Sequence, residues 1–108
     1  MPSHRQLGNP FEALGDPQRR AIVQLLRKGP QSVQALADAL PISRPAVSRH
    51  LRLLKDAGLV SMQPQGTLRL YQLDEAGART VRAYLEKVWG EAARRFTIVA
   101  ENTRGRRR

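Results

Sequence analysis

Two short apolar periodicities, separated by only a few residues, constrain the fold of this chain more than any other feature. The first follows a capping serine, Ser32, and consists of Val33, Leu36, Ala37 and Leu40. The second follows Ser43 and consists of Val47, Leu51 and Leu54. Both have the spacing of one helix face. Because only Pro41 and Ile42 separate the first stripe from Ser43, the pattern predicts two helices joined by a tight turn, a helix-turn-helix.

Further helices are predicted on both sides of this pair. Residues 11–14 form a short first helix, and Asp16 with Pro17 begins a second helix that ends at Gly29-Pro30. Asp74 caps a long last helix with an apolar stripe of Ala78, Val81, Leu85, Val88, Ala92, Phe96 and Val99. This stripe is longer than the core of so small a domain requires, which indicates a helix from a second copy as its partner.

Between Val60 and Leu73 the period changes from helical to alternating. β-Branched and apolar residues surround Gln65-Gly66, which predicts two strands joined by a tight turn. Pro64 indicates an edge position, and the pattern leaves open which face of the hairpin is buried. The expected fold class is mainly α with a small β-hairpin, a winged helix-turn-helix domain over residues 9–101. Residues 1–8 are expected to be a flexible N-terminal segment, and residues 102–108 a basic, disordered tail.

The charge of the chain narrows the class of partner. Its 108 residues carry 19 Lys and Arg against 9 Asp and Glu, a net charge of +10. Much of the excess gathers in the helix after Ser43 and in the arginines of residues 104–108. The chain has no cysteine, which excludes disulfides, thiolate metal sites and thiol catalysis. Since it has neither a long apolar segment nor a secretory start, we expect a cytoplasmic protein. A small basic domain points first to nucleic acid.

The helix after Ser43 carries the chemistry expected of a recognition helix. Its exposed face presents Pro45, Ser48, Arg49 and Arg52, with Arg44 on the flank. Arginine can donate two hydrogen bonds to a guanine, and serine suits a phosphate. A merely solvated amphipathic helix is the alternative, but the position after a helix-turn and before a hairpin favours DNA. Arg69, near the hairpin turn, could reach a minor groove or be an ordinary solvated strand residue.

Four stretches, in order along the chain, resemble signatures of the ArsR-type winged helix-turn-helix repressors. They are residues 14–22 (LGDPQRRAI), 43–51 (SRPAVSRHL), 56–60 (DAGLV) and 71–74 (YQLD), and the resemblance spans about residues 11–89. It implies a homodimer that binds an inverted repeat of double-stranded DNA and represses transcription, often of its own operon. Such a protein belongs to the prokaryotic cytoplasm and nucleoid.

The resemblance also implies roles for individual residues. The positions that correspond to DNA contacts are Arg44, Pro45, Ser48 and Arg49, to which we add Arg52 and Arg69. The family dimerises through its first and last helices, which here carry Phe11, Leu14, Val81, Leu85, Val88, Trp89, Ala92 and Phe96. We interpret Trp89 as core or dimer packing, although a residue lining a ligand pocket between protomers is the alternative.

Metal sensing and catalysis are not expected. Metal sensors of the family carry cysteines in the helix that here follows Ser32, and others use histidines of the last helix, but no histidine follows His50. Two isolated histidines cannot supply a metal site. Ser48 and His50 lie about 200° apart on one helix and cannot form a nucleophile–base pair. We therefore predict no metal, no cofactor and no enzymatic activity; whether an organic effector exists stays open.

Two other functions remain as alternatives. One is a basic nucleic-acid-binding or ribosome-associated protein that relies on charge and lacks sequence preference. The other is an interaction module whose long last helix binds a different protein.

Overall fold

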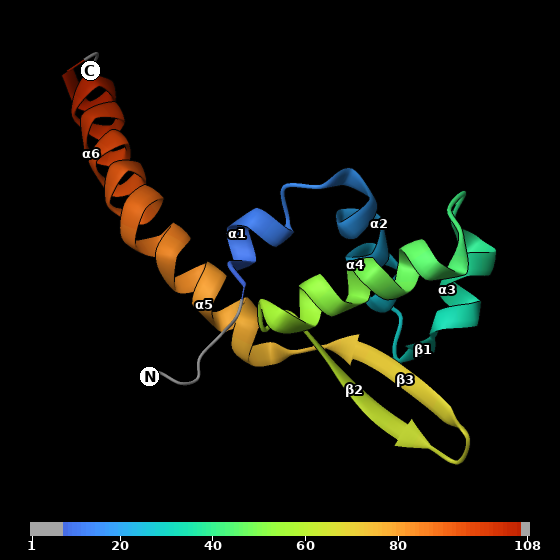
Figure 1. Ribbon diagram of the computed structural model, residues 1–108. Helices are drawn as coiled ribbons and strands as arrows, with labels where there is room; N and C mark the ends of the chain where they lie inside the picture. The colour runs from blue at the N-terminus through green and yellow to red at the C-terminus, as the bar shows by residue number, and fades with distance from the viewer. Residues whose placement is uncertain (1–7, 107–108) are drawn as a thin grey trace. The chain divides into compact units, whose positions relative to one another are not determined.

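The computed structural model describes residues 8–106, with side chains up to residue 101. The helices are α1 (Pro10–Ala13), α2 (Pro17–Leu26), α3 (Val33–Ala39), α4 (Arg44–Asp56), α5 (Glu75–Leu85) and α6 (Glu91–Arg106), with a π-helical segment η1 (Glu86–Gly90) between the last two. The strands are β1 (Gln31–Ser32), β2 (Val60–Gln65) and β3 (Leu68–Leu73), as Figure 1 shows. The chain divides into two compact units, one up to Ala78 and one from Arg79.

Capping side chains begin the helices where the sequence predicts. Asp16 Oδ1 accepts hydrogen bonds from the backbone N–H groups of Gln18 at 2.8 Å and Arg19 at 3.1 Å. The other predicted caps, each accepting one backbone N–H, are Ser32, Ser43 and Asp74. Each cap satisfies a donor that the first turn of a helix leaves unpaired.

The core of the first unit consists of the predicted apolar stripes. Its largest fully buried side chains are Ile22, Leu36, Val47, Leu51, Leu54 and Val60. Three of them lie on α4, which makes contacts with α1, α2, α3 and β2. The predicted inward face of α4 is therefore confirmed. Its opposite face lies in solvent, because burial of one helix stripe exposes the other.

The predicted hairpin is present, but the sheet has a third strand. The strand order is β1-β3-β2 and all pairs are antiparallel. The two residues of β1 pair with Tyr71 and Leu70, and they are too few to produce a sequence periodicity. Strand β2 carries Pro64 and lies at the edge, as predicted.

The hairpin turn lies one residue later than expected. Its two loop residues are Gly66 and Thr67. Gly66 has a φ of +62°, and no non-glycine residue described has a positive φ. A positive φ at only the first loop residue is typical of a type II′ turn, whose twist matches that of the strands.

The second unit is helical to its described end. The long last helix is present, with η1 as an unexpected π-helical segment. The Glu86 carboxylate passes over Gly90 and forms an ion pair of 3.6 Å with Arg94. Residues 102–106 continue α6, so the expected disordered tail is not seen there; extending an existing helix costs far less than starting one. Residues 107–108 and, apart from Gly8, the expected flexible segment 1–8 lie outside the described residues.

Across residues 8–106, the structure contains no helix both long and apolar enough to cross a membrane.

Candidate nucleic-acid interface

Helix α4 presents all of its predicted DNA-contacting side chains to solvent. The exposed residues are Arg44, Pro45, Ser48, Arg49 and Arg52. Arg44 and Ser48 are four residues apart and share one flank of the helix, whereas Arg49 is turned about 100° from Ser48. The helix therefore offers two adjoining polar surfaces, which we call the flank (Arg44, Ser48) and the outer face (Pro45, Arg49).

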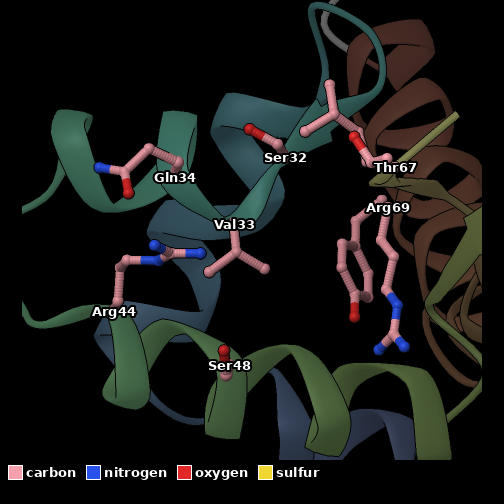
Figure 2. A pocket seen from close by; sticks show the side chains of 9 residues that line it. Ser32, Val33, Gln34, Arg44, Ser48, Thr67 and Arg69 are labelled. Atoms are coloured by element: carbon pink, nitrogen blue, oxygen red, sulfur yellow. The ribbon is translucent and has the colours of Figure 1, made fainter. Parts of the chain in front are cut away.

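The flank of α4 forms one wall of an open groove. The groove has a volume of about 300 Å³ and is lined by Ser32, Val33, Gln34, Arg44, Ser48, Thr67, Leu68, Arg69 and Tyr71. The start of α3 and the hairpin form its other walls. Figure 2 shows the Arg69 side chain extending from the hairpin toward α4, and the Arg44 side chain extending toward Val33. None of the nine lining residues is acidic.

Six arginines of this unit, on α2, α4 and β3, fall into two groups. Arg19 donates from Nε to the Ala13 carbonyl at 2.7 Å and lies 3.3 Å from His50 Nδ1, while Arg20 donates to the Leu14 carbonyl at 2.8 Å. These two arginines hold the end of α1 and serve the fold.

The second group consists of arginines without a partner among the described residues. Within residues 8–101, the side chains of Arg44, Arg49, Arg52 and Arg69 make no hydrogen bond or ion pair. All four are exposed. Unpaired guanidinium groups gathered on one surface are available to phosphates or base edges.

The structure brings together only part of the predicted set. Arg44, Ser48 and Arg69 line the groove, whereas Pro45, Arg49 and Arg52 do not. Sequence reasoning missed the other six lining residues: Ser32, Val33, Gln34, Thr67, Leu68 and Tyr71. The pairing of β1 with β3 brings the start of α3 to the groove, and no local pattern reveals that pairing. Tyr71 carried a signal, since it stands two residues from Arg69 on one strand.

Asp16 and His50 join the structural arginine Arg19 in one network. The backbone N–H of Arg19, with that of Gln18 and the Arg19 charge, lowers the pKa of Asp16 against a smaller opposing effect of burial. Arg19 Nη1 also lies 3.3 Å from His50 Nδ1, which brings the imidazole into the same network. In the part of the chain that the structure describes, no three His, Asp or Glu residues cluster as metal ligands would.

Most of the predicted dimerisation residues are exposed in the single chain. Phe11 on α1 is exposed, and Leu14 is half-buried. In the second unit, Leu85, Val88, Trp89, Ala92 and Phe96 are exposed and Val81 is half-buried. Trp89 and Phe96 are 60% and 75% exposed. Large apolar side chains exposed at this density indicate a surface that a partner covers.

Comparison with known proteins identifies the family. The sequence model described as "Bacterial regulatory protein, arsR family" matches residues 16–62. The HTH-type transcriptional regulator Rv2034 of Mycobacterium tuberculosis is 48% identical over 92 residues, which cover 85% of this chain and 86% of that protein. The transcriptional repressor SdpR of Bacillus subtilis is 37% identical over 63% of this chain and 76% of its own length.

A solved structure agrees with this assignment. The homodimeric winged helix-turn-helix DNA-binding domain Mb0332 of Mycobacterium bovis, described as a possible ArsR-family regulator, is 31% identical. It superimposes with a TM-score of 0.63, over 84% of this chain and 90% of that one. The chain is thus a winged helix-turn-helix protein that belongs to the ArsR family of bacterial transcriptional regulators, which are DNA-binding proteins and not enzymes.

Proposed function

We propose that this regulator is a homodimeric repressor that binds an inverted-repeat operator, its own promoter included. The observation that carries the proposal is the group of four exposed arginines on α4 and the hairpin, which have no partner within residues 8–101. A fold that needed these cations for its own stability would pair them, as it pairs Arg19 and Arg20.

In this proposal α4 enters the major groove. Pro45 and Arg49, on the outer face of α4, point to the base edges, where an arginine can bind guanine O6 and N7 with two hydrogen bonds. Arg44 and Ser48 on the flank contact the DNA backbone beside the major groove. Arg52, farther along the helix, and Arg69, on the hairpin, contact the DNA backbone as well. Binding to chromosomal DNA would place the protein in the nucleoid.

Dimerisation is supported by two observations. The C-terminal unit exposes a row of large apolar side chains that includes Leu85, Trp89 and Phe96. The similar domain from Mycobacterium bovis is homodimeric. We propose that Phe11, Leu14 and the predicted apolar residues of α5, η1 and α6 form the dimer interface. The two copies of α4 would then bind half-sites about 34–36 Å apart on one face of the duplex.

The repressor role is supported by the name of the SdpR relative and is tested at the protein's own promoter. DNA from upstream of its gene is incubated with the protein and footprinted, and transcription from the same fragment is measured. We expect one protected inverted repeat and reduced transcription. A protected site with increased transcription would make the protein an activator.

Arg49→Ala tests the role of the recognition helix. Loss of a two-bond base contact should weaken binding to the protected site by about 1–3 kcal/mol per contact and relax base preference at one position of each half-site. Arg82→Ala on α5 removes the same charge outside α4 and should retain the preference. An Arg49→Ala protein with unchanged site selectivity would contradict the assignment. Equal affinity of the natural protein for random DNA at the same salt would instead favour a basic module without sequence preference.

A further inference from the structure

We infer that the groove between α4 and the hairpin holds one strand of the DNA backbone, and that the Tyr71 hydroxyl donates a hydrogen bond to a phosphate there. The inference rests on the proposed DNA binding. It adds a contact residue beyond the arginines and serine already described, and it specifies where one strand runs.

The sheet fixes the position of Tyr71. It lies on β3, the central strand, between Gln31 of β1 and Met62 of β2. Arg69 is two residues earlier, so both side chains project from the same face, about 7 Å apart along the strand. At Tyr71, β3 is paired with a strand on each side, so this residue is held more rigidly than one on an edge strand.

The Tyr71 hydroxyl has no partner in the part of the chain that the structure describes. The side chain is half-buried and lines the groove, yet within residues 8–101 its hydroxyl makes no hydrogen bond. In the free protein, water can serve this group. A ligand that fills the groove displaces that water, and an unpaired hydroxyl would then cost binding energy. The occupant of the groove must therefore supply an acceptor to Tyr71.

The charge of the groove indicates an anionic acceptor. Arg44 and Arg69 stand on different walls of the groove, and the lining contains no carboxylate. The Ser48 hydroxyl lies on the same wall as Arg44 and also lacks a partner among the described residues. Two cations line the groove together with four hydroxyls, those of Ser32, Ser48, Thr67 and Tyr71. These donors match the oxygens of a sugar-phosphate strand.

The orientation of α4 favours the backbone over the bases as the occupant. When a helix lies in the major groove of DNA, its outer face points to the base edges and its flanks point to the two sugar-phosphate backbones. On the flank, Ser48 is about 100° and Arg44 about 140° from Arg49 around the helix axis. Tyr71 lies across the protein's groove from this flank and therefore faces a DNA backbone. It is expected to contact DNA independently of the base sequence.

Tyr71→Phe tests the inference, because it removes one hydroxyl and retains the ring. Two duplexes of about 30 base pairs serve as probes: one that the natural protein selects from a random pool, and a scrambled version of it. We expect Tyr71→Phe to weaken binding to both by roughly tenfold, because a dimer loses two hydrogen bonds worth about threefold each. The salt dependence should stay unchanged, since tyrosine is neutral, whereas Arg69→Gln should reduce the slope of log K against log salt by about 2.

Tyr84→Phe is the matched control, since it alters the chain's other tyrosine, which does not line the groove. It should bind both duplexes like the natural protein. The melting temperature of Tyr71→Phe should match that of the natural protein, which separates a lost contact from a damaged fold.

The possible outcomes separate the inference from the proposed function. If Tyr71→Phe binds both duplexes normally, the hydroxyl contacts no phosphate and the inference fails while DNA binding stands. A loss confined to the selected duplex would make Tyr71 a base-reading residue and would also overturn it. If a nucleoside monophosphate displaces the DNA at matched ionic strength, the groove belongs to a small phosphate ligand instead. Failure of the natural protein to bind either duplex would refute the proposed function itself.

Discussion

The salt dependence of DNA binding can count the arginines that reach the DNA. On α4 and the hairpin, each protomer exposes four that have no partner among the described residues: Arg44, Arg49, Arg52 and Arg69. If each displaces one counterion, a dimer releases about eight, and log K should fall against log salt with a slope near −7. Fluorescence anisotropy of a labelled duplex, titrated at several salt concentrations, measures this slope.

Two variants of equal charge change test whether the division of arginines is real. Arg69→Gln removes an unpaired cation and should bring the slope to about −5, because a dimer loses two contacts of about 0.9 each. Its stability should be unchanged. Arg19→Gln removes the same charge but also the bonds to Ala13 and His50. It should cost about 1–3 kcal/mol, which lowers the melting temperature by roughly 5–15 °C, and leave the slope near −7.

The result that would refute this reasoning is equal behaviour of the two variants. If Arg19→Gln and Arg69→Gln lower the slope by the same amount, overall charge governs binding and the arrangement of the arginines does not. A slope near −2 for the natural protein would contradict the count itself.

Three further predictions concern the fold and the assembly. The lowered pKa of Asp16 means that its carboxylate stabilises the folded state above about pH 4, and this stabilisation is lost as the pH falls through the lowered value. Asp16→Asn should remove that part of the acid sensitivity in melting curves from pH 2 to 7. Gly77→Ala should lower the free energy of unfolding, measured in urea, by about 3 kcal/mol, because its Cβ would lie 2.9 Å from the Leu59 Cα atom. The Cβ of Gly90→Ala meets only the Glu86 side chain, so this variant should be nearly as stable as the natural protein. Replacing both Trp89 and Phe96 by alanine should convert a dimer of about 24 kDa into the 12.1 kDa chain in sedimentation equilibrium, and an unchanged mass would place the interface elsewhere.

Local features of the sequence were sufficient to predict the recognition helix. The Ser43 cap and the following Pro45 define where α4 begins, and the spacing of Val47, Leu51 and Leu54 defines its buried face. Once that face is known, the exposed positions of Ser48 and Arg49 follow from helix geometry alone. The polar surface of α4 could therefore be predicted without any knowledge of tertiary contacts.

The groove could not be predicted in this way, because pairing between distant residues creates it. Gln31 and Ser32 pair with Tyr71 and Leu70, about 40 residues later, and only this pairing brings Gln34 to the same groove as Arg69. The different uses of Arg19 and Arg69 were equally hidden, since the two residues contribute the same charge to the composition. What distinguishes them is the nearby Ala13 carbonyl, which the fold supplies to Arg19.

Selection of binding sites from a random-sequence DNA pool tests the central claim most directly. A homodimer with one α4 per protomer should enrich an inverted repeat whose half-site centres lie about 10 base pairs apart. Enrichment of a single unrepeated half-site would contradict the dimer. Failure to enrich any sequence, with binding that depends on salt alone, would contradict recognition by α4 altogether.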